Sequence, residues 1–169
     1  MVNPVHLVTK MTSASAPSPF AVASSGDLAT AYANFQAFDG NQFAYPNSTW
    51  LGSAASSWIS IDLGAGNTFP ALSQYSIQPP VTFGSGYFPT GWTFAGSNDN
   101  STWTTIDAKS AQTLASATNY FSVSPGVAYR YYRWSMSNSG SSVGADELGL
   151  YYVPSANGGT PLIGEGLVY

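Results

Sequence analysis

Residues 57–63 read SWISIDL, with a branched apolar side chain at every second position. Ile59, Ile61 and Leu63 fall on one face of an extended chain, because successive side chains of a strand point to opposite faces. The positions between them hold a serine and an aspartate, which favour contact with water. This period of two predicts a half-buried β-strand rather than a helix.

The same alternation recurs along the chain between clusters of Gly, Pro, Asn and Ser. Only Asp27–Phe38 has the spacing of a short helical turn. Short strands separated by turn residues are typical of an antiparallel sandwich or jelly roll, so we expect an all-β fold. The further strand-like runs are Leu72–Gln78, Trp92–Ser97, Thr102–Asp107, Asn119–Val123, Tyr129–Met136 and Leu148–Val153.

The composition narrows the range of functions. The chain of 169 residues has only 7% charged residues, a net charge of −4 and no cysteine. The four basic residues are scattered, which argues against binding to nucleic acid or to anionic membranes as the function. No apolar run is long enough to span a membrane. The N-terminus shows none of the features of a signal peptide, so we expect a virion surface, or release to the extracellular space, rather than general secretion.

Seven segments of the chain together carry a further signal: Phe38–Asn41, Trp58–Gly64, Tyr75–Ile77, Gly91–Trp103, Tyr120–Val123, Tyr129–Trp134 and Glu147–Tyr151. In their residues and their order they resemble discoidin domains, also called coagulation factor type C domains, and the related family 32 carbohydrate-binding modules. The resemblance covers about residues 13–153. It implies a jelly roll of eight strands without catalytic machinery.

The resemblance also implies a structural calcium ion near the binding loops. Calcium takes six to eight oxygen ligands, including carboxylates, carbonyls and hydroxyls. The alternative is that Asp39 caps its own turn and that Glu147 makes an ordinary hydrogen bond. The matching positions are Phe38 and Asn41 through their backbone, Asp39, Ser48 or Thr49, and Glu147.

Carbohydrate binding would use aromatic faces in loops, flanked by a few directed hydrogen bonds. Three segments are long enough to form such loops: 41–56, 79–91 and 137–146. Most aromatic residues of a sandwich belong to its core, so an interface with a partner protein is the alternative use of an exposed one. The candidates are Tyr45, Trp50, Tyr87 and Phe88, with Asn138 as a polar partner.

Two charged positions and one histidine complete the candidate residues. We expect either Arg130 or Arg133 to pair with Asp62, because a charge near the sheet needs a partner. The alternative is a guanidinium group that reaches a sugar hydroxyl. His6 is the only histidine and lies in the expected lead-in of residues 1–12, so no catalytic triad can be built.

The leading hypothesis is a non-catalytic carbohydrate-binding module, with a glycan as ligand, on the surface of a bacteriophage virion. We expect residues 154–169 to form an extended arm whose apolar side chains dock on other virion subunits, with a homo-oligomer as one form of such an assembly. The alternative is a decoration protein that uses the sandwich only for protein contacts. Glycoside hydrolysis is a third reading, which the position of the carboxylates on turns disfavours.

Overall fold

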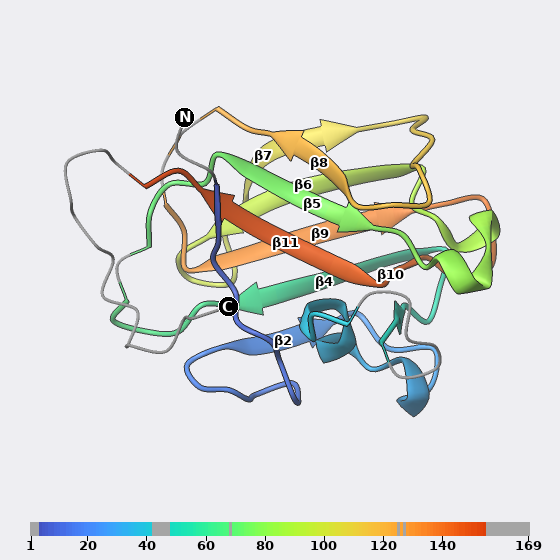
Figure 1. Cartoon of the computed structure of the whole chain (residues 1–169), viewed down its shortest axis with the longest axis horizontal. Coiled ribbons are helices and arrows are strands. Elements are labelled where there is room, and N and C mark those ends of the chain that lie inside the picture. The colour runs from blue at the N-terminus through green and yellow to red at the C-terminus, as the bar shows by residue number, and fades with distance from the viewer. Residues whose placement is uncertain (1–3, 42–47, 68, 125, 127, 155–169) are drawn as a thin grey trace.

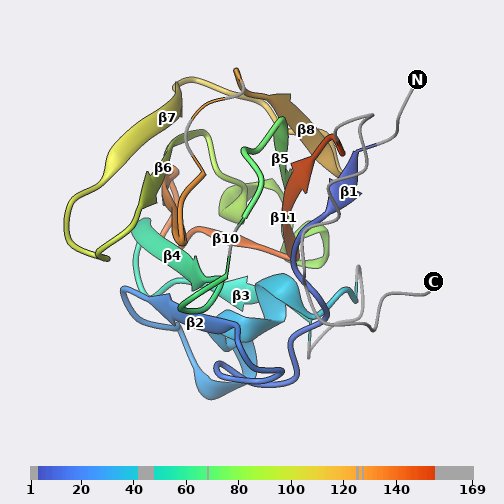
Figure 2. The ribbon, with the colours of Figure 1, turned by 90° about the vertical axis from the view of Figure 1, so that its left-hand side faces the viewer.

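The computed structural model describes residues 4–41, 48–67, 69–124, 126 and 128–154. Two antiparallel sheets pack face to face, as the end-on view in Figure 2 shows. The first sheet has the order β2-β4-β9-β6-β7, with strands Ala21–Ser24, Ser56–Asp62, Tyr131–Ser137, Gly91–Ser97 and Thr104–Lys109. The second has the order β1-β11-β5-β8, with strands Val5–His6, Glu147–Tyr152, Gln74–Gln78 and Asn119–Ser122. A short pair, β3 (Trp50–Leu51) and β10 (Gly144–Ala145), lies beside them. The predicted all-β sandwich is therefore confirmed.

The core lies between the two sheets and is rich in aromatic residues. Ile59 and Ile61 of β4 are fully buried, as the period of two predicted. The ring of Tyr75 on β5 stacks on Phe94 of β6, with the ring centroids 4.3 Å apart. The Tyr75 hydroxyl accepts a hydrogen bond from Trp92 Nε1 and donates one to Asp107, both at 2.7 Å. These bonds satisfy Trp92 Nε1 and the Tyr75 hydroxyl, which the aromatic packing carries into the core.

The N-terminal segment belongs to the sandwich, which corrects the expected lead-in of residues 1–12. In its described part, residues 4–12, β1 pairs with β11 and adds a ninth strand to the two sheets. The side chains of Leu7, Val8 and Met11 are buried in the core. His6 lies opposite Tyr151 within the second sheet, so it is part of the domain. Apolar side chains at these positions gain more from burial than from exposure, which explains why the segment packs.

The expected ion pair involves Arg130. Its Nε and Nη2 atoms donate to the two carboxylate oxygens of Asp62, each at 2.7 Å. The guanidinium group of Arg133 instead lies over the ring of Trp103, 4.1 Å from its centroid, with Trp58 5.8 Å away. Each arginine therefore has a structural partner on the first sheet.

The helical turn expected within residues 27–38 is confirmed as two short 3₁₀ helices, η1 (Thr30–Tyr32) and η2 (Asn34–Phe38). Two more, η3 (Val81–Phe83) and η4 (Ser85–Tyr87), lie in the loop between β5 and β6. Backbone hydrogen bonds join segments 54–55 and 138–143, and Asp146 N donates to Gln78 O at 2.9 Å. These loops therefore gather at one end of the sandwich, on the right in Figure 1.

No helix in the described part of the chain is long and apolar enough to cross a membrane.

Candidate functional site

Three aromatic side chains meet at the loop end of the sandwich, each from a different 3₁₀ helix. The ring of Phe83 in η3 lies edge-on to Tyr32 of η1, with the centroids 5.3 Å apart, and to Tyr87 of η4, at 5.6 Å. Gly84 separates η3 from η4 with a φ of 82°, a conformation that favours glycine. We call Tyr32, Phe83 and Tyr87 the loop-end cluster. All three side chains are partly exposed, so the cluster has surface to offer a ligand.

The sequence pointed to only one member of this cluster, Tyr87. Tyr32 lies in the stretch 27–38, whose spacing predicts a helical turn, and Phe83 lies in a run that has no clear period. Their placement beside Tyr87 depends on how the loop between β5 and β6 packs against η1. The signal that was available is the glycine-rich sequence from 84 to 86, which predicts tight turns that bring flanking side chains together.

Two of the predicted aromatic contacts are wrong because their side chains lie in the core. Trp50 is 0% exposed, and its Nε1 donates to Asp27 Oδ1 at 3.0 Å. Phe88 is 8% exposed. Neither ring can stack on a ligand from solvent, since burial against protein already covers its faces. Tyr45 lies outside the described residues.

Asn138 braces the loop end rather than facing a ligand. Its Nδ2 donates to the backbone oxygens of Gly86, at 3.0 Å, and Ser142, at 2.6 Å. Its Oδ1 accepts from Gly140 N at 3.0 Å. With both amide donors and the acceptor engaged, Asn138 ties the segment before β10 to η4, which carries Tyr87. Its expected role as a direct polar partner of a ligand is therefore corrected to a supporting one.

Asp39 and Glu147 place two carboxylates beside each other at the same end. Glu147 Oε2 accepts from Gly40 N at 2.9 Å, and Asp39 Oδ1 accepts from Asn41 N at 2.8 Å. Burial, and then the nearby carboxylate of Asp39, raise the pKa of Glu147 to about 9. Burial also raises the pKa of Asp39. The turn and hydrogen bond that formed the alternative to a metal site are thus present, and burial disfavours the ionised form of both carboxyl groups.

Comparison with known families decides what this sandwich is. The model of the F5/8 type C domain matches residues 20–146, which is most of the chain. The chain belongs to this family. No curated protein matches the sequence of this F5/8 type C domain.

Solved structures share the fold at low sequence identity. The family 32 carbohydrate-binding module of C. perfringens NanJ, in complex with galactose, is 16% identical, with a TM-score of 0.65 over 79% of this chain and 93% of that one. Chitosan-binding module 1 of a Paenibacillus sp. IK-5 chitosanase/glucanase is 15% identical, with a TM-score of 0.65 over 88% and 99%. An F5/8 type C domain from Bacteroides fragilis is 21% identical, with a TM-score of 0.64 over 83% and 96%. These likenesses establish the fold of this F5/8 type C domain.

The predicted calcium ligands fit that ion in part. Carboxylate oxygens suit calcium, and neither Asp39 nor Glu147 forms a salt bridge with a described residue. The Thr49 hydroxyl, however, donates to Asp146 Oδ1, and Phe38 O accepts from Met11 N at 2.9 Å. Of the other two predicted ligands, Asn41 is exposed and Ser48 is buried. Among the described residues, no three histidine, cysteine, aspartate or glutamate side chains come close enough together to hold a metal.

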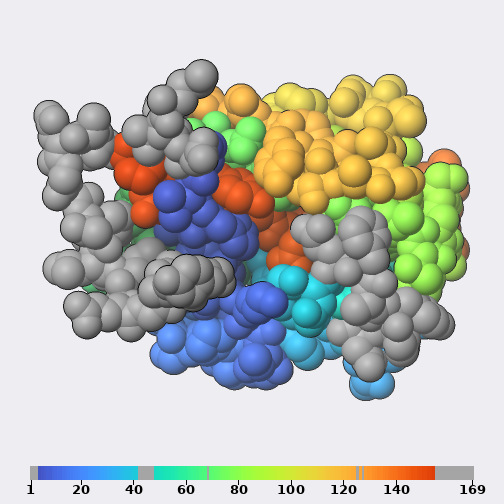
Figure 3. Space-filling model, in the orientation of Figure 1, coloured from blue at the N-terminus to red at the C-terminus, as the bar shows by residue number. Residues whose placement is uncertain are grey.

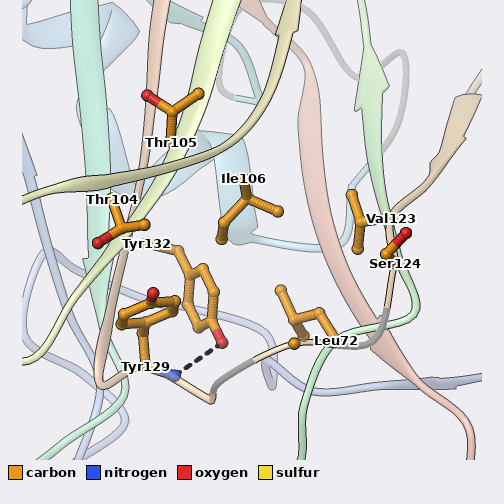
Figure 4. Close-up of a pocket in the computed structure, with 9 residues that line it drawn as sticks. Leu72, Thr104, Thr105, Ile106, Val123, Ser124, Tyr129 and Tyr132 are labelled. Atoms are coloured by element: carbon orange, nitrogen blue, oxygen red, sulfur yellow. Dashed lines mark hydrogen bonds between the residues drawn. The ribbon is translucent and has the colours of Figure 1, made fainter.

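A separate hollow of about 190 Å³ opens between the sheets beside β7. Figure 4 shows Ile106, Leu72 and Val123 around it, with the Tyr132 hydroxyl accepting a hydrogen bond from Tyr129 N at 3.1 Å. None of the described residues that line it is charged. The hollow is small and largely apolar, and it lies apart from the loop-end cluster and the two carboxylates. It therefore offers little to a polar ligand.

Proposed function

We propose that this F5/8 type C domain is a non-catalytic carbohydrate-binding module whose ligand lies against the loop-end cluster. The observation that carries the proposal is the meeting of Tyr32, Phe83 and Tyr87 at the end of the sandwich where the long loops gather. Aromatic rings stack on the apolar face of a pyranose, and the adjoining loops supply hydrogen-bonding groups. Structural relatives support this chemistry, since one is described with galactose and another as chitosan-binding.

The rigidity of the cluster supports the same proposal. Asn138 ties the neighbouring loop to η4, and Asp146 Oδ2 accepts from Val81 N at 3.3 Å, at the start of η3. Both helices that carry Phe83 and Tyr87 are therefore anchored to the segment before β11. A preorganised surface binds a ligand more tightly, because less conformational freedom is lost on binding.

Calcium would be held by Asp39 and Glu147 in this proposal. A divalent cation would favour the ionised form of both carboxyl groups, which burial disfavours in its absence, and it would stabilise the turn that follows η2. Lys10 is the competing source of positive charge. Its stem lies on Gly40, where an added Cβ would come within 2.7 Å of Lys10 Cε, and its charge lowers the pKa of Asp39 and Glu147.

A glycan array, with and without a chelator, tests the proposal most directly. The matched pair of variants is Tyr87→Ala at the cluster and Tyr131→Ala, a similarly half-buried tyrosine on β9. Tyr87→Ala should weaken binding about fivefold to tenfold, since a stacked aromatic ring contributes about 1 kcal/mol. Tyr131→Ala should leave binding unchanged. Equal loss in both variants, or no loss in either, would contradict a ligand at the cluster.

The proposal includes display on a particle surface, such as a bacteriophage virion, through the arm of residues 154–169. Pro154 is the last residue that the structure describes, so the rest of the arm, residues 155–169, lies outside the described part. Its sequence supports docking, because it combines turn formers with Leu162, Ile163 and Leu167. Deleting residues 155–169 should keep glycan binding and abolish incorporation into particles. Incorporation of the shortened chain at the normal level would place docking elsewhere.

A further inference from the structure

The outer face of the second sheet carries a second aromatic surface, away from the loop end. The strand register sets His6, Tyr151 and Gln74 opposite one another in one row, and Ser76 opposite Tyr120 in the next. Residues opposite each other in an antiparallel sheet share a face. Figure 3 shows this side of the molecule, with β1 in blue, β11 in red and β8 in orange.

Tyr151 lies flat on this face instead of standing away from it. A Cβ built on Gly149 would fall 2.6 Å from Tyr151 Cε2, so the ring crosses the strand directly over that glycine. Its hydroxyl is 3.4 Å from Ser76 Oγ on the neighbouring strand. His6 packs against the ring from the other side, with the centroids 4.9 Å apart. The ring is therefore held in place before any ligand arrives.

Tyr120 forms the second wall of an open hollow. Its side chain is 55% exposed, and its ring is tilted by 60° to that of Tyr151, with the centroids 5.7 Å apart. Pro4 and Gln74 complete the lining of the hollow. Its volume of about 440 Å³ is within the roughly 300–1,000 Å³ of small-molecule sites. None of these four side chains is charged.

We propose that this surface is a second carbohydrate-binding site, for the neutral pyranose units of an oligosaccharide. A preformed tyrosine ring offers a flat face for stacking, and an exposed ring at an angle to it closes on a second face of the sugar. The Gln74 amide and the tyrosine hydroxyls supply directed hydrogen bonds at the rim. The uncharged lining selects a neutral sugar over a uronic acid or a sulfated one.

The site is independent of the loop-end cluster. No residue of η1, η3 or η4 lines the hollow. Tyr151 lies four residues along β11 from Glu147, which is about 13 Å at the rise of a strand. Two sites on one rigid module would engage two stretches of the same polysaccharide, so the polymer would be held more tightly than a short oligosaccharide.

Fluorine NMR of protein labelled with 3-fluorotyrosine resolves the two sites in one titration. The probes are chitohexaose, cellohexaose and β-1,4-galactohexaose, and each resonance is assigned with a Tyr→Phe variant. We expect at least one probe to shift the Tyr120 and Tyr151 resonances saturably, with Tyr131 unmoved as the internal control. Tyr120→Ala should weaken binding at Tyr151 about fivefold to tenfold, whereas Tyr120→Phe should retain it.

Each outcome decides the inference separately from the proposed function. Shifts confined to Tyr32 and Tyr87 would support the loop-end site and overturn this one. Shifts confined to Tyr120 and Tyr151 would support this site and count against the loop-end proposal. No shift at Tyr120 and Tyr151 with any probe overturns the inference. Shifts of the Tyr120 and Tyr151 resonances that depend on protein concentration in the absence of sugar would show that a second copy of the chain binds this face. That result would also overturn the inference.

Discussion

Glu147 gives the acidic loop end a measurable signature in the stability of the domain. Its side chain is 8% exposed, and burial together with the carboxylate of Asp39 raises its pKa to about 9 from its ordinary value of 4.5. The folded protein therefore keeps a proton on Glu147 that the unfolded chain releases. Stability from this group is complete below the unfolded pKa and is lost as the pH rises towards the folded pKa.

The size of the effect follows from that difference. Between the two pKa values, the free energy of unfolding falls by about 1.4 kcal/mol for each pH unit. From about pH 7 to about pH 8.5 the loss is about 2 kcal/mol, or roughly 4–8 °C in Tm for a domain of this size. His6 does not interfere, because burial lowers its pKa from 6.5 and so moves its titration below this window. Burial raises the pKa of Asp39 and Asp146, so their contributions have the same sign as that of Glu147.

The assay is urea unfolding followed by tryptophan fluorescence, in EDTA, across this pH window. Glu147→Gln retains an oxygen that can accept the hydrogen bond from Gly40 N and carries no charge, so its stability should change far less with pH. The variant should also be more stable than the wild type at the upper end of the window. If the stability of the wild type does not change with pH, or if the variant shows an equal slope, the assignment of the pH dependence to Glu147 is refuted.

Three further changes test separate parts of the structure. Calcium at a hundred times its Kd should add about 2.7 kcal/mol to the stability of the wild type, and Asp39→Asn should remove that gain in thermal melts; an unchanged melt would count against a calcium site. Trp50→Ala should cost about 3–5 kcal/mol by chemical denaturation, because the ring is core; a neutral variant would return Trp50 to the list of surface contacts. Gly64→Ala should destabilise by more than about 1 kcal/mol, since φ is 95° and the new Cβ would lie 2.4 Å from Pro19 Cβ; an unchanged Tm would show that the turn can relax.

The strands of the sandwich could be located from the sequence because each has a local signal. In SWISIDL, the period of two predicts that Ile59 and Ile61 lie on the same face, and both are fully buried. The turn from Asn98 to Ser101 is likewise local, because Asp99 accepts hydrogen bonds from the backbone of Ser101 and Thr102, two and three residues further on. Local signals of this kind do not require knowledge of the distant chain.

The segments without a clear period were predicted less well. Trp50 and Phe88 lie in stretches rich in Gly, Pro and Ser, which predicted exposed loops, yet both rings are buried. The N-terminal residues lacked a strand-like run, but β1 pairs with β11, nearly the whole chain away. In both cases the burial depends on a partner surface that is remote in sequence.

Local patterns predict the all-β class without the structure, because alternation and turn chemistry act over a few residues, and the order of the segments supplied the resemblance to the family. Which aromatic rings face solvent depends on the tertiary structure. Period two shows that Tyr120 and Phe121 point to opposite faces of β8, but not which face the first sheet covers. That choice is made by the packing of β5 and β8 against β6, which places the partly buried Phe121 against Tyr75 of the core and leaves Tyr120 outside. Burial depends on all the surfaces that meet at a residue, and those surfaces come from distant parts of the chain.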